Sequence, residues 1–178
     1  MPEFIYLPSR PDKFKLGYRN MCNFWFCNFW KYLKEYDKIL RIDEDCYYYS
    51  DYNKVFKLLN NKVFVYGGRT GDKDFVTKGL NNFTLDFMKQ NNIKNIYRRS
   101  PSGPLTHVIG INLDRCRKNT LLTKYISSIK TSNNIYVYRW GDLPLWGESI
   151  EYFFENKDRL STSKIQYYHE SHKARINC

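Results

Sequence analysis

The sequence has 178 residues, of which 42% are hydrophobic and 18% aromatic, so it can bury the core of one folded domain and is not of the disordered class. Its net charge of +11 favours anionic partners, but the basic residues are scattered, so a phosphate-bearing substrate suits it as well as a polynucleotide does. No apolar run reaches the ~18 residues of a membrane span, and the five cysteines include no Cys-x-x-Cys pair of the kind found in structural zinc sites.

The N-terminal part of the sequence predicts a short lead-in followed by a helix. Residues 1–16 contain three prolines and are expected to be extended, ahead of a single domain over residues 17–178. From Gly17 to Tyr36, large apolar side chains recur at helical spacing, which predicts a largely buried helix. Residues 38–42 then form an apolar strand candidate that stops at three consecutive acids.

The rest of the chain alternates between helix and strand patterns. In chain order, we predict a helix over 52–61, a strand over 62–68, a helix over 71–92 with Asp74 as its N-cap, a strand over 105–113, a helix over 119–130 capped by Asn119, a strand over 134–142, a helix over 142–154, a strand over 164–168 and a polar tail over 169–178. Polar residues gather where the strands end. This order predicts an α/β fold whose sites lie beyond the carboxyl ends of strands.

The three acids Asp43, Glu44 and Asp45 form the first candidate site. In extended backbone, residues two apart face the same side, so Asp43 and Asp45 could converge on one point while Glu44 faces away. Paired carboxylates are hard oxygen ligands suited to Mg²⁺ or Mn²⁺, and such an ion can bridge to a diphosphate. The alternative is a solvated acidic loop, which the spacing by itself favours.

A second candidate lies in "YRWGDLP", residues 138–144. Asp142 follows a predicted strand, where its carboxylate could point into a cleft or cap the next helix. Trp140 could stack against a sugar or belong to the core. In the tail, His169 and His172 are candidate metal ligands. His107, within an apolar strand, is expected in the core, and no motif of a nucleophilic triad or a phosphate-binding loop occurs.

Taken together, the motifs have a recognisable order. They are "GYRNMCNFW", "YDKILRIDEDCYYYSDYNKVF", "YGG", "YRWGDLP" and a tail with His before "NC". This series, over residues 17–178, resembles glycosyltransferase family 15, the fungal-type α-1,2-mannosyltransferases. The resemblance implies a GT-A-like fold, which is a mixed sheet flanked by helices, here without its first strands. It also implies GDP-mannose as donor, Mn²⁺ as cofactor and retaining transfer onto mannosyl glycans of glycoproteins in the Golgi or secretory lumen.

The resemblance also assigns roles to residues. The metal ligands it implies are Asp43, Asp45 and His172, with His169 as the second choice. The catalytic residues it implies are Asp142, Tyr18 and Asp74, of which Asp74 matches by spacing only. The residues it implies for substrate binding are Arg19, Asp43, Arg139 and Trp140.

The sequence departs from the family pattern in two places that bear on function. Asn112 stands where the family has a Glu, and only about sixteen residues precede Gly17, where the family has the first strands of its nucleotide-binding half. A separate chain could supply that portion. An inactive remnant that binds a glycan or a protein is therefore the alternative to an enzyme, and a basic nucleic-acid-binding module is a further alternative. No signal peptide or membrane anchor is recognised in this sequence.

Overall fold

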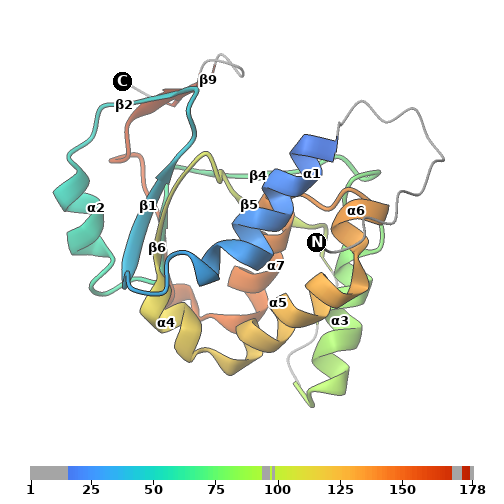
Figure 1. The fold of residues 1–178 in the computed structure, drawn as a ribbon. Helices are drawn as coiled ribbons and strands as arrows, with labels where there is room; N and C mark the ends of the chain where they lie inside the picture. Colours follow the sequence, from blue (N-terminus) through green and yellow to red (C-terminus); the bar gives the residue numbers. More distant parts are fainter. Residues whose placement is uncertain (1–15, 94–96, 98, 170–173, 177–178) are drawn as a thin grey trace.

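A four-stranded mixed sheet organises the chain (Figure 1). The computed structural model describes residues 16–93, 97, 99–169 and 174–176. Residues 1–15 of the lead-in predicted for residues 1–16 lie outside the described residues, and Leu16 is the first residue of a helix. The strand order is β1 (Lys38–Ile42), β6 (Val108–Asn112), β3 (Phe64–Tyr66) and β7 (Arg159–Ser161). β6 is antiparallel to both β1 and β3, whereas β3 and β7 are parallel. The prediction of a mixed α/β sheet is confirmed.

Side chains that alternate along the strands supply two hydrophobic layers, one on each face of the sheet. On β3, Phe64 and Tyr66 belong to the larger core cluster and Val65 to the smaller one. α2 (Tyr52–Leu58) packs with the smaller cluster. The larger face is covered by α3 (Leu80–Gln90), α5 (Thr120–Ser132) and α7 (Asp142–Phe153), as Figure 1 shows. The sheet is therefore flanked by helices on both sides.

The N-terminal helix is shorter than its aromatic pattern predicts. α1 (Leu16–Asn23) passes into a π-helical turn (Phe24–Asn28) and a 3-10 turn (Phe29–Lys31), so regular helix ends well before Tyr36. Phe26 of the π-helical turn and Phe29 of the 3-10 turn are both fully buried, and both pack against the ring of Trp146 in α7. Packing of aromatic rings thus decides the form of this segment.

Two other predictions of secondary structure are wrong, and one further helix was not predicted. Residues 134–137 form a helix, α6 (Asn134–Val137), because Asn133 turns the chain at the end of α5 with a left-handed φ of 59°. α3 begins at Leu80 after Gly79, so Asp74 is not its N-cap. The stretch after β6 is helical, α4 (Leu113–Lys118), with Asn112 as its cap.

Several short strands escape the sequence patterns, whereas the strand predicted over 164–168 is present as β8 (Tyr167–His169), which begins three residues later. β4 (Arg69–Gly71) pairs with β5 (Ser102–Pro104), and β2 (Cys46–Tyr48), β8 and β9 (Ala174–Ile176) form a separate three-stranded sheet. In Figure 1 this small sheet lies beyond the upper end of β1, so it continues the chain from the acidic turn. No helix in the described part of the chain is long and apolar enough to cross a membrane.

Two glycines allow close backbone approaches that hold the layers together. A Cβ on Gly110 of β6 would lie 2.8 Å from Cγ1 of Val55, so the missing side chain lets α2 pack onto the sheet. A Cβ on Gly147 would lie 1.8 Å from the carbonyl oxygen of Ser102, so α7 and β5 pack backbone against backbone. The second contact fixes where the N-terminal end of α7 lies.

Candidate functional site

The candidate site is centred on Arg41, a charged residue inside the apolar strand β1. Its side chain is 4% exposed and bonds to two carboxylates. Nε lies 2.8 Å and Nη2 3.3 Å from the two oxygens of Asp43, and Nη1 lies 2.5 Å from Oδ2 of Asp142. Arg41 therefore joins the end of β1 to the first turn of α7. Sequence reasoning missed it, although a lone Arg in "KILRI" before three acids was a usable signal.

The electrostatic surroundings of Arg41 keep it charged. Burial by itself would lower the pKa of Arg41, but Asp142 and Asp43 raise it above its ordinary value. The guanidinium also lies 4.5 Å from the ring centroid of Trp25, which favours the cation. The buried Asp142 carboxylate, 3% exposed, thus has a permanent positive partner.

The acidic segment is a tight turn and not the extended backbone that the prediction assumed. The amide of Cys46 donates to the carbonyl oxygen of Asp43 at 3.0 Å, which closes the turn. As a result Asp43 faces Arg41, whereas Oδ1 of Asp45 lies 3.3 Å from Nε2 of His169. Glu44 is exposed, which agrees with the prediction that it faces away.

A group of possible metal ligands forms where β2 pairs with β8. Asp45, Cys46 and His169 each offer one ligand atom, and these atoms lie within 4.8 Å of one another. His169 is 5% exposed, and its ring stacks on that of His107 with 4.3 Å between centroids. His107 is half-buried and shares a 2.7 Å hydrogen bond with the Tyr167 hydroxyl. His169 is therefore the histidine brought to Asp45, whereas His172 lies outside the described residues.

Tyr18 and Arg139 lie on the α1 side of Asp142. The Arg139 guanidinium carbon is 4.5 Å from the Tyr18 ring centroid. Burial, with smaller effects of Cys22 and Asp142, raises the pKa of Tyr18, so its hydroxyl remains protonated at neutral pH. Burial and Asp142 likewise raise the pKa of Cys22 to about 12. Tyr18 can therefore donate a hydrogen bond but is not a base.

Asp72, and not the Asp74 that the resemblance implied as a catalytic residue, is the acid that lies beside Arg139. Oδ2 of Asp72 lies 3.7 Å from Nη1 of Arg139, whereas Asp74 is exposed in the loop before α3. Both acids follow "YGG", so spacing alone could not distinguish them. Arg139 itself has a φ of 61°, a left-handed conformation that turns the chain into the segment before α7.

The remaining predicted site residues have structural partners. Trp140 is 1% exposed, packs against Phe83 and donates from Nε1 to the Lys78 carbonyl at 2.9 Å, so it lies in the core as the alternative interpretation had it. Arg19 donates to the carbonyl oxygen of Tyr136 and ties α1 to α6. Burial thus leaves Trp140 without an open aromatic face for stacking on a sugar.

Asn112 lies far from this group. Its Oδ1 accepts from the amide of Arg115 at 3.0 Å as the cap of α4, and its amide donates to the Leu59 carbonyl at 2.8 Å. It pairs with Lys38 in the β1–β6 ladder, whereas Asp43 follows the other end of that ladder. Four residue steps separate the ends by about 13 Å. The replacement of the family's Glu by Asn112 therefore removes no carboxylate from the group around Arg41.

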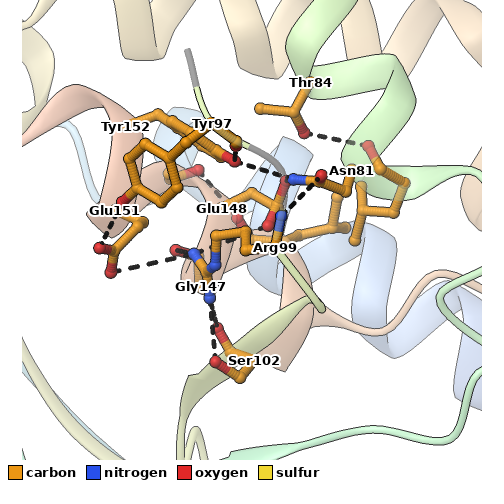
Figure 2. Close-up of polar contacts among 12 residues, drawn as sticks. Asn81, Thr84, Tyr97, Arg99, Ser102, Gly147, Glu148, Glu151 and Tyr152 are labelled. Carbon is orange, nitrogen blue, oxygen red and sulfur yellow. Dashed lines mark hydrogen bonds and ion pairs between the residues drawn. The ribbon is translucent and has the colours of Figure 1, made fainter. Parts of the chain in front are cut away.

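A second polar network, drawn in Figure 2, surrounds Glu148 of α7. Glu148 is fully buried; Asn81 donates to its Oε2 at 3.0 Å, and Arg99 lies 3.6 Å from its Oε1. Burial raises the pKa of Glu148. Arg99 also donates to the carbonyl oxygens of Ser102 and Gly147 at 2.8 and 3.2 Å, so the network fixes the chain before β5 onto α7.

The next turn of α7 extends the network to the surface. Burial by itself would raise the pKa of Glu151, but hydrogen bonds from Arg159 and Tyr97 lower it to about 2. The Arg159 contact is 2.6 Å long. A polar cavity of about 490 Å³ opens beside Arg99 and Asn81, and its lining includes none of the carboxylates around Arg41. Sequence patterns gave no sign of this network.

Comparisons with known proteins give the fold. No protein-family model matches the sequence, and no curated protein matches it significantly. Among solved structures, the mannosyltransferase Ktr4p from S. cerevisiae matches with a TM-score of 0.77 at 20% identity, covering 88% of this chain and 47% of that one. Core-mannan synthase A (CmsA/Ktr4) from Aspergillus fumigatus, in its Mn/GDP-form, matches with a TM-score of 0.75 at 19% identity, covering 87% and 48%.

These matches confirm the resemblance to fungal mannosyltransferases and the GT-A-like fold at the level of structure. A second structure of Ktr4p, in complex with GDP, matches with a TM-score of 0.75 at 20% identity. The chain spans about half the length of the solved structures it matches.

Proposed function

We propose that this chain is part of a metal-dependent glycosyltransferase that transfers mannose from GDP-mannose to a mannosyl glycan of a glycoprotein, with retention and an α-1,2 linkage. The observation that carries the proposal is the turn after β1. It presents Asp43 to Arg41, which also bonds to Asp142, and it presents Asp45 to His169. This arrangement lies in a fold shared with mannosyltransferases solved with GDP and with Mn/GDP.

The donor set fits a divalent cation. A carboxylate oxygen from Asp45 and an imidazole nitrogen from His169 are both ligands that Mn²⁺ accepts. A cation bound there would neutralise charge on the diphosphate leaving group. Asp43 serves this site indirectly in the proposal, because its oxygens are engaged by Arg41 and fix the start of the turn.

The residues around Asp142 would orient the sugar and the acceptor. Arg41 binds Oδ2 of Asp142 and so holds this carboxylate in place. The other oxygen, Oδ1 of Asp142, is directed toward α1 and lies 3.8 Å from the Cys22 sulfur. The protonated Tyr18 hydroxyl is a donor on the same side, and Arg139 stacks on its ring. Positioning of this kind is a large part of group-transfer catalysis.

The charge and length of the chain suggest how the binding site for the nucleotide-sugar donor is completed. A net charge of +11 favours a nucleotide diphosphate. Because the chain spans about half of the matched structures, we place the rest of the donor site on another segment or on a separate chain. The secretory lumen is the proposed location, by likeness to the family.

Calorimetric titration with GDP, with and without Mn²⁺, tests the proposal. We expect GDP binding that requires the ion and is weakened in Asp45→Asn. Asp86→Asn, which removes an exposed carboxylate paired with Lys89, is the matched control and should bind GDP like the parent. GDP binding that ignores both the ion and Asp45 would contradict the proposal.

Turnover is tested separately, because a remnant of the fold could bind GDP without transferring sugar. Transfer of labelled mannose from GDP-mannose to an α-mannoside by the purified chain would distinguish the enzyme from the inactive alternative. The amide at Asn112 does not favour the inactive alternative, because Asn112 caps α4 at the opposite end of the β1–β6 ladder from Asp43.

A further inference from the structure

The ligand atoms gathered by β2 and β8 include one that manganese does not favour. Beside the carboxylate of Asp45 and the imidazole of His169 lies the sulfur of Cys46. Carboxylate oxygens suit Mn²⁺, whereas thiolate sulfur is a soft ligand that selects Zn²⁺. We propose that Cys46 is a third ligand of this site and increases its preference for Zn²⁺ over Mn²⁺. The inference rests on the proposed function for placing a cation here.

The backbone holds Cys46 and His169 directly opposite each other in the β2–β8 pair. The amide of Tyr49 donates to the carbonyl of Gln166 at 2.9 Å, which is one of the two bonds that mark a hydrogen-bonded position in the ladder. Pairs alternate along an antiparallel ladder, so Cys46 and His169, three steps along, form a non-hydrogen-bonded pair. In such pairs the Cβ atoms are about 4.5–5.5 Å apart on the same face. The strand register therefore aims sulfur and imidazole at one point.

The side chains need little movement to bind one ion. In the tetrahedral geometry of zinc, two bonds of about 2.0–2.3 Å place two ligand atoms about 3.3–3.8 Å apart. The three atoms lie within 4.8 Å of one another, so an approach of about 1 Å brings them to one ion. No disulfide joins Cys46 to the other cysteines of the described residues. On binding, the sulfur–zinc bond replaces the sulfur–hydrogen bond, and the proton passes to the buffer.

Cobalt spectroscopy reports on the sulfur directly, because a thiolate bound to Co²⁺ gives a charge-transfer band in the near ultraviolet. We expect this band when Co²⁺ is added to the parent protein and its loss on addition of Zn²⁺. Cys46→Ser should lack the band. Cys27→Ala, which removes a buried thiol in the π-helical turn after α1, is the control and should retain it.

Competition titrations measure the preference. Cys46→Ser should lose at least about tenfold in Zn²⁺ affinity while its Mn²⁺ affinity changes little, so the ratio of the two affinities should fall at least about tenfold. Circular dichroism checks that Cys46→Ser is folded. The charge-transfer band of the parent protein tests the inference even if this variant does not fold. No charge-transfer band in the parent, or equal Zn²⁺ affinity in the parent and Cys46→Ser, would overturn the inference.

The two proposals fail in different ways. Mn²⁺-dependent GDP binding without a charge-transfer band would leave the proposed function standing and refute the role of Cys46. A charge-transfer band in a chain that binds no GDP with any cation would support the role of Cys46 and refute the proposed function.

Discussion

The buried ion pair between Arg41 and Asp142 supports a quantitative prediction. Both side chains are 4% exposed, and their nearest atoms are 2.5 Å apart. Removing one partner of such a pair leaves a buried charge without compensation, which typically costs about 3–5 kcal/mol. Asp142→Asn keeps the size of the side chain but removes its charge. Arg41 then retains Asp43, so we expect the lower end, a loss of about 3 kcal/mol in the free energy of unfolding.

Urea unfolding at pH 7, followed by circular dichroism, measures this loss. The matched control is Asp86→Asn, because Asp86 and Lys89 are both 66% exposed and an exposed pair contributes less than about 0.5 kcal/mol. The slope of the transition should be the same in both variants. A loss in Asp142→Asn below about 1 kcal/mol, comparable with the control, would refute the view that Arg41 and Asp142 form an essential buried pair.

Two further predictions concern packing and pH. Gly110→Ala should lower the free energy of unfolding by about 1–3 kcal/mol in the same assay, because its Cβ would lie 2.8 Å from Val55. Gly17→Ala is the control and should not destabilise the protein, because a Cβ there meets nothing within 4 Å. Equal effects of the two changes would contradict this reasoning. Because the pKa of Glu151 is lowered from 4.5 to about 2, its contact with Arg159 stabilises the fold above about pH 4.5 and is lost as the pH falls toward 2. Glu151→Gln should therefore be less stable than the parent at pH 7, and a stability difference that stays constant from pH 5 to pH 2 would be inconsistent with this.

Local patterns in the sequence were enough for elements whose signal is short-range. β1 has the predicted bounds, Lys38–Ile42, because an apolar run ends at acids that cannot continue it into the core. α5 begins where Asn119 was predicted to cap it, since the side chain accepts from the amide of Leu122. The prediction failed at Asn134–Val137, where tertiary packing overrode residues with strand propensity.

The candidate site was likewise predictable only in part. The sequence singled out Asp45 and Asp142, because each lies in a short motif of consecutive residues. Which groups they meet was decided by contacts between distant parts of the chain.

The sequence by itself thus determined an α/β fold, a group of three acids directly after β1 and a resemblance to mannosyltransferases. Only the tertiary structure decided that Arg41 joins Asp43 to Asp142, that Asp72 faces Arg139, and that Cys46 and His169 stand opposite each other. The physical reason is that strand register and helix packing are set by burial of the whole core. A one-residue shift of register would move Cys46 to the other face of β2 and away from His169.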